Sequence, residues 1–185
     1  MMSTNRSERL KNLSPQKREL LLKALGKEAV QAEQSQRIPK REQQNHAPLS
    51  FAQQRLWFLD RLSPQNPAYN LPAAVRLQGQ LNLLALQQTL NEIVRRHEVL
   101  RTALAEVDGQ PIQLISPSLN FALSAVNLQH LPETEQQAEI EQRTIEEAQR
   151  PFDLTRDPLM RGTLLQLSPA EYVLLLTVHH IISDG

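Results

Sequence analysis

Two adjacent histidines and a nearby carboxylate are the residues of this chain best suited to chemistry. His179 and His180 are followed, four residues after the second, by Asp184 and then by Gly185. A neutral imidazole can accept a proton near physiological pH, and a carboxylate can orient an imidazole or hold an arginine. Such a set would serve acyl transfer. The alternative is that both histidines merely end a strand with satisfied hydrogen bonds, but their pairing with Asp184 and Gly185 favours the chemical interpretation.

Residues 171–178 must position this group. After Glu171 they carry no charge and are mostly aliphatic or β-branched, which predicts one buried strand, too short to span a membrane. Neighbouring side chains of a strand point to opposite faces, so at most one of the two imidazoles faces a given cleft. We therefore expect one histidine at a catalytic position and the other in packing.

The composition limits the classes of protein to which the chain can belong. Its 185 residues suffice for one core and a tail, and its 20 basic and 20 acidic side chains cancel, so neither nucleic acid nor a membrane is expected as a partner. The chain has no cysteine and its beginning is charged, unlike a secretion signal, so the cytoplasm is the expected location. It shows neither a glycine-rich phosphate loop nor the spacing of a zinc site, so no bound cofactor or metal is expected.

Three regions follow one another along the chain. Residues 1–30 include a short helix over 14–26, between a serine cap and a glycine stop, which is either a docking element or a plain linker helix. Residues 31–47 are rich in glutamine and charged side chains and are expected to form a polar linker. The folded region is expected over 48–185.

Capping, hydrophobic periodicity and turn signals predict the elements of this folded region. Helices are expected over 48–62, 82–97 and 133–149, and strands over 71–79, 102–105, 111–115, 121–126, 160–167 and 171–178. Two antiparallel hairpins are expected, one around the turn at 107–110 and one formed by the last two strands.

The first of these helices concentrates aromatic side chains. Ser50 and Gln53 have the spacing of a capping box, and the only tryptophan lies in the helix with two of the four phenylalanines. The broad apolar face predicts a well-buried helix whose aromatic rings pack in the core. Arg55, if it is buried among these rings, would need a partner.

A cluster of charges follows the second helix, at 95–101. It is either a solvated helix end or a buried ion-pair network. We favour the network for Arg96 and Arg101, because a loop carboxylate such as Asp184 would need a fixed cationic partner.

Three segments resemble the condensation domains of nonribosomal peptide synthetases. Residues 50–59 are similar to the opening motif of that family, and residues 96–104 to its second motif, with Leu104 where the family usually has phenylalanine. Residues 179–185 match the HHxxxDG active-site motif at every fixed position. The order and spacing of the three segments also agree.

The resemblance covers about residues 48–185. It implies an α/β architecture of the α+β type, namely one lobe of the chloramphenicol-acetyltransferase-like fold, with a mixed sheet flanked by helices. In that family, carrier domains bring two phosphopantetheine-tethered groups to opposite ends of a channel between two lobes. The acyl or peptidyl group then moves to the amine of the aminoacyl group, and an amide forms.

The resemblance also implies roles for individual residues. His180 would accept a proton from the amine or hold the amine in position, and the backbone amide of Gly185 would help to orient the acyl carbonyl. Asp184 would be structural, paired with Arg96 or Arg101. The implied catalytic motif comprises His179, His180, Asp184 and Gly185, with Arg55, Arg96 and Arg101 as structural support.

The chain stops at Gly185, directly after the motif, so the second lobe is missing. We therefore expect a fragment or split partner of a condensation domain that is inactive alone and that depends on the missing lobe, on carrier domains and on neighbouring synthetase modules. Two alternatives remain. One is a coenzyme A-dependent acyltransferase of the same fold, against which the first two motifs argue; the other is a noncatalytic interaction module.

Overall fold

The computed structural model describes residue 41, residues 44–156 and residues 158–183. Contacts divide the chain into two units, residues 1–42 and 43–185, and all the elements described below belong to the second unit. The helix predicted over 14–26 lies outside the described residues, and so do Asp184 and Gly185. Among the described helices, none is both long enough and apolar enough to cross a membrane.

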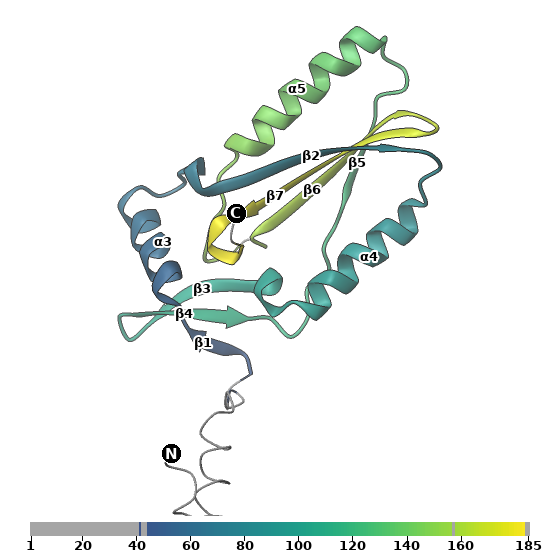
Figure 1. Cartoon of the computed structure of the whole chain (residues 1–185). Helices are drawn as coiled ribbons and strands as arrows, with labels where there is room; N and C mark the ends of the chain where they lie inside the picture. Colours follow the sequence, from purple (N-terminus) through teal and green to yellow (C-terminus); the bar gives the residue numbers. More distant parts are fainter. Residues whose placement is uncertain (1–40, 42–43, 157, 184–185) are drawn as a thin grey trace, which may run out of the picture. The chain divides into compact units, whose positions relative to one another are not determined.

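A four-stranded mixed sheet carries the predicted histidine strand. Its order is β2-β7-β6-β5, formed by strands β2 (Asn70–Gln78), β7 (Glu171–His179), β6 (Met160–Ser168) and β5 (Ser124–Asn127) (Figure 1). β7 is antiparallel to both of its neighbours, which confirms the predicted β6–β7 hairpin. β5 is parallel to β6, so the chain must cross over between them, and it does so through helix α5 (Glu133–Gln149).

Two helices cover the opposite faces of this sheet. Leu165 and Leu175 belong to a cluster with Ile140 of α5, whereas Leu164 and Leu174 pack on the other side with Leu86 of α4 (Leu83–Arg96). Because alternate residues of β7 are buried by different helices, the strand needs apolar side chains on both faces. This is why residues 172–178 form a nearly unbroken apolar run.

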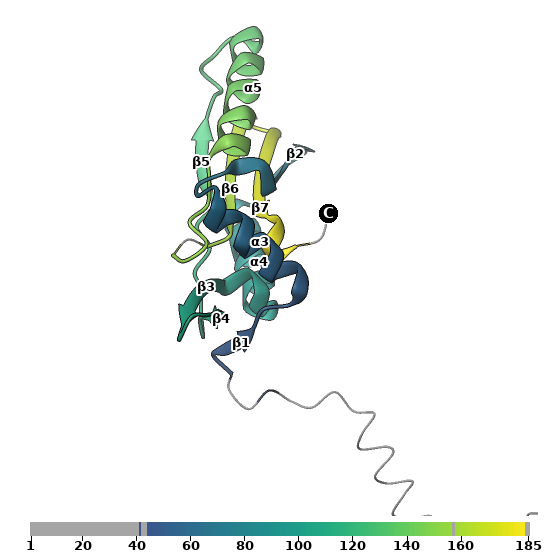
Figure 2. The ribbon, with the colours of Figure 1, turned by 90° about the vertical axis from the view of Figure 1, so that its left-hand side faces the viewer.

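A second, three-stranded sheet has the order β1-β4-β3, from β1 (His46–Pro48), β4 (Gln110–Ile115) and β3 (Thr102–Val107). The predicted β3–β4 hairpin is confirmed, and its turn residues Asp108 and Gly109 have φ angles of 51° and 74°. Aspartate and glycine tolerate such left-handed backbone angles better than most residues. Figures 1 and 2 place α5 at one end of the unit and this sheet at the other, with the end of β7 between them.

Helix α3 (Phe51–Leu62) lies beside the end of β7. Its cap is the predicted box, in which the Ser50 side chain accepts the N–H of Gln53 and the Gln53 side chain accepts the N–H of Ser50. The described part of the unit also contains three short 3₁₀ turns: η1 (Pro67–Tyr69), η2 (Glu98–Arg101) and η3 (His180–Ile182).

The predicted burial of all the aromatic rings of α3 is wrong. Trp57 is buried, but the side chains of Phe51 and Phe58 are 90% and 60% exposed, and that of Leu62 is also exposed. Positions 51, 58 and 62 recur at seven and four residues, so they share one stripe of the helix, on the side away from Trp57. The helix packs through its other side only.

Candidate active site

The end of β7 gives the two adjacent histidines different environments. His179 is 4% exposed, and its ring lies edge-on to Phe152 with 6.0 Å between the ring centroids, near the ring of Tyr69. Its Nδ1 accepts the backbone N–H of Ile181 at 3.1 Å. Burial, with a smaller contribution from the charge of His180, lowers the pKa of His179 to about 4. His179 is therefore neutral near pH 7 and packed.

His180 follows in η3 and is half-buried. Its Nδ1 lies 2.6 Å from the backbone carbonyl oxygen of Ser183. A carbonyl oxygen can only accept, so Nδ1 must carry the proton. In the neutral ring Nε2 then keeps its lone pair and is available to accept a proton or to hold an N–H group.

His180 lies on the wall of a pocket of about 550 Å³ between α3 and η3. The pocket combines apolar and uncharged polar side chains with one guanidinium. Its lining comprises Ser50, Ala52, Gln53, Arg55, Leu56, Tyr69, Val99, His180, Ile181, Ile182 and Ser183. A mostly uncharged wall with a few polar groups is typical of sites for small molecules or for tethered groups.

The arginines selected from the sequence fall in three different places. Arg55 is exposed and lines the pocket. The predicted burial of Arg96 is wrong: its side chain is 67% exposed and pairs with Glu92 at 2.7 Å, one helical turn away. Arg96 is the last residue of α4, where its side chain extends into solvent. Whether Asp184 pairs with either Arg96 or Arg101 lies outside the described residues.

Arg101 is the buried member of this set. Its side chain is 13% exposed, lies 3.7 Å from Glu98 and donates from Nη1 to the backbone carbonyl of Ser116. Its buried Nε has no hydrogen-bond partner among the residues that the structure describes. Buried polar groups are rarely left in this state.

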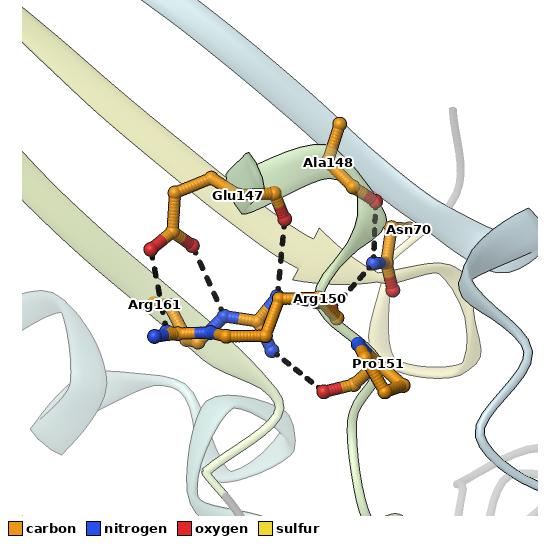
Figure 3. Close-up of polar contacts among 6 residues, drawn as sticks. All are labelled: Asn70, Glu147, Ala148, Arg150, Pro151 and Arg161. Carbon is orange, nitrogen blue, oxygen red and sulfur yellow. Dashed lines mark hydrogen bonds and ion pairs between the residues drawn. The ribbon is translucent and has the colours of Figure 1, made fainter. Parts of the chain in front are cut away.

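A charged cluster between β6 and the end of α5 was not identified from the sequence. Arg161 of β6 is 14% exposed and contacts Glu147 of α5 at 3.2 Å (Figure 3). The same guanidinium donates to the backbone carbonyls of Glu147, Arg150 and Pro151, at the end of α5. The available signal was a single arginine within an otherwise uncharged strand, since a buried charge requires partners.

This cluster extends to the first histidine. The guanidinium of Arg161 stacks on the ring of Phe152 at 3.7 Å from its centroid, and Phe152 in turn packs edge-on against His179. Asn70 of β2 pairs with His179 in the sheet and donates to the carbonyls of Ala148 and Arg150. The end of α5 thus braces the two strands that carry the site.

Residues 43–185 match the sequence model of the condensation domain family. This match covers most of the chain, and the chain belongs to that family. The fold class predicted from the sequence is also confirmed, because the starter condensation domain of rhizomide synthetase RzmA (mutant R148A) aligns with 76% of the chain at a TM-score of 0.70 and 25% identity.

The relatives are parts of peptide synthetases. One of the linear gramicidin synthase proteins of Brevibacillus parabrevis is 49% identical over 140 residues, or 76% of this chain. Phosphinothricin tripeptide synthetase PhsC of Streptomyces viridochromogenes is 40% identical over 178 residues, or 96% of this chain. The chain spans 2% and 16% of the lengths of these two proteins and 34% of the solved RzmA chain. It corresponds to one part of a condensation domain.

Proposed function

We propose that this chain supplies the histidine-bearing part of a condensation domain that forms an amide between a carrier-tethered acyl or peptidyl group and a carrier-tethered aminoacyl group. The observation that carries the proposal is the geometry of His180. Its Nδ1 is bound to the carbonyl of Ser183, and its ring borders the pocket beside α3. This leaves Nε2 to accept a proton from the attacking amine or to hold that amine toward the thioester.

Other members of the motif act around this imidazole. His179 is a packed, neutral neighbour that orients η3 by accepting the N–H of Ile181. The backbone N–H of Gly185 orients the acyl carbonyl, and Asp184 is a structural residue. The buried Nε of Arg101 has no partner among the described residues, which supports Arg101, rather than the solvated Arg96, as the partner of that carboxylate.

The chain needs no cofactor of its own under this proposal. Its substrates arrive on the phosphopantetheine arms of carrier domains, and the rest of the condensation domain closes the channel. The folded part of the chain begins a little before the expected residue 48, because His46 and Ala47 already pair with β4 as part of β1. The residues between 31 and this strand form a linker, and residues 1–30 dock or link to a neighbouring module. A chain without cysteine suits the cytoplasm, where the assembly would work.

A chimera tests the catalytic proposal. Residues 43–185 replace the matching segment of a condensation domain of linear gramicidin synthase, and amide formation between loaded carrier domains is measured by mass spectrometry. His180→Ala should lower the rate about 100-fold or more, the loss expected when a general base or positioning group is removed. His130→Ala, the same replacement at an exposed turn outside the three motifs, serves as the control and should retain the rate.

The outcomes separate this function from its rivals. Equal product formation by the chimera and its His180→Ala variant would instead identify a noncatalytic interaction module. Acyl transfer from free coenzyme A thioesters to an alcohol, with no carrier requirement, would identify the related acyltransferase class. The 185-residue chain alone is expected to form no amide, and turnover by it would contradict the proposed dependence on the rest of the domain.

A further inference from the structure

Gln53 connects three elements through one side chain. Its Oε1 accepts the backbone N–H of Ser50 at 3.0 Å and so completes the cap of α3. Its Nε2 donates to the backbone carbonyl of Ile181 in η3 at 3.2 Å and to Oε1 of Gln113 in β4 at 3.3 Å. The side chain is part-buried on the wall of the His180 pocket. All of its polar atoms are in use.

The helix cap explains only half of these contacts. A capping box needs an acceptor at this position, and glutamate fulfils that need as well as glutamine does. The donation from Nε2 to Ile181 requires an amide, because an ionised carboxylate only accepts. The contact with η3 is thus chemically separable from the cap.

The turn that receives this hydrogen bond is short. η3 is three residues long, and it is held by donation from Ser183 N–H to the His180 carbonyl at 3.2 Å and from Ile181 N–H to Nδ1 of His179 at 3.1 Å. Short 3₁₀ turns have poor internal hydrogen-bond geometry. A donor from α3 therefore adds an anchor from outside the turn, beside the contact of His180 Nδ1 with Ser183 and the packing of Ile181 and Ile182 in the core.

We propose that Gln53 is a positioning residue for His180. By holding the carbonyl of Ile181 against α3, it fixes the turn in which the carbonyl of Ser183 stays within reach of His180 Nδ1. That contact determines which imidazole nitrogen keeps its lone pair. That Gln53 restrains the turn follows from the geometry alone. That this restraint affects the reaction rests on the proposed function.

Two variants of the 185-residue chain test the restraint by NMR. Gln53→Glu keeps the acceptor of the cap and removes the donor to Ile181. Gln54→Glu is the matched control, since its side chain donates to the carbonyl of Leu49 and does not line the pocket. Gln53→Met, which keeps the length of the side chain without its polar atoms, decides the test if the carboxylate variant does not fold.

The expected result is local to the turn. In Gln53→Glu, hydrogen exchange of the Ser183 and Ile181 amides should accelerate about 2- to 10-fold, as expected for one lost hydrogen bond, while the Gln54 amide in the cap stays protected. The ¹⁵N signals of the His180 ring should report a mixture of tautomers in place of the Nδ1-protonated form. Gln54→Glu should change neither signal. Unchanged turn amides in the Gln53 variants, or equal changes in the control, would overturn the proposal.

The effect on the reaction is measured in the chimera with the gramicidin synthase domain. Gln53→Glu should lower kcat about 10- to 100-fold and leave KM within about two-fold, because a misplaced group slows the chemical step more than binding. A full rate in Gln53→Glu, when His180→Ala is inactive, would refute the positioning role. Full rates in both variants would refute the proposed function instead and leave the NMR result to decide the restraint.

Discussion

Asn70 lies directly opposite His179 in the ladder between β2 and β7, and its side-chain amide binds the last carbonyls of α5. One residue thereby connects the strand that carries the histidines with the helix end that Arg161 also binds (Figure 3). The carbonyls at a helix end lack partners within the helix, so side chains that satisfy them stabilise the end. The site is consequently sensitive to changes well outside the pocket.

Removal of this amide should destabilise the unit. Asn70→Ala loses two hydrogen bonds at 2.8 and 2.9 Å in a buried position, and we expect a loss of about 2 to 3 kcal/mol in the free energy of unfolding. Urea unfolding monitored by Trp57 fluorescence measures it. Asn127→Ala, which removes the acceptor of two exposed local hydrogen bonds from Gln129, is the control and should cost less than about 1 kcal/mol. Similar losses in both variants would contradict the bracing role of Asn70.

Protonation of His179 should weaken the fold in mild acid. The folded-state pKa is about 4 and the ordinary value is 6.5, so between these values the unfolded chain binds the proton and the folded chain does not. The contribution of His179 is complete above pH 6.5, falls as the pH is lowered toward 4 and then levels. A shift of this size corresponds to a loss on the order of 3 kcal/mol.

Unfolding free energies from about pH 7 to pH 4 check this dependence. His179→Gln keeps an acceptor for the Ile181 N–H and removes the titration, so its curve should be flatter than that of the original chain across this window. His46→Gln, the same replacement at an only partly buried strand end, is the control. Parallel curves for the original chain and His179→Gln would show that the imidazole is not held neutral by burial.

Gly162 should not tolerate a side chain. A Cβ added there would lie 3.0 Å from the ring of Phe121 and 3.1 Å from both Leu123 and Leu176. Overpacking of this kind costs about 1 to 3 kcal/mol, so thermal unfolding of Gly162→Ala should occur several degrees lower. The control Ala125→Gly, an exposed position of the adjacent strand, removes a methyl group instead and should cost about 1 kcal/mol or less. An unchanged melting temperature in Gly162→Ala would show that the three neighbours can move apart.

Replacement of two neighbouring aromatic residues of α3 should change the free energy of unfolding by very different amounts. Trp57→Ala removes a buried ring and is expected to cost about 3 to 5 kcal/mol, whereas Phe58→Ala, at a 60% exposed position, should stay within about 1 kcal/mol. Calorimetry measures both.

The variant Phe51→Gln with Phe58→Gln should also reduce self-association in light scattering, because it removes an exposed apolar stripe. Strong destabilisation by the exposed-face changes would show that this stripe is packed.

The sequence by itself determined the local elements and the family. Strand β7 was identifiable because both of its faces are buried, which requires a continuous apolar run, and the cap of α3 because Ser50 and Gln53 bond to each other's backbone three residues apart. The hairpin turn at Asp108 and Gly109 follows from the backbone angles that these residues tolerate. Each of these signals is written within a few residues, and the spacing of the motifs added the resemblance that the family match confirms.

Only the tertiary structure decided which side of each element is covered. Periodicity shows that α3 has apolar residues, but not that packing uses the side of Trp57 and leaves Phe51 exposed. In the same way, Arg161 is buried with Glu147, whereas Arg96 is solvated with Glu92. Burial and charge pairing depend on segments distant in sequence, and the distinction between the packed His179 and the pocket-lining His180 depends on them too.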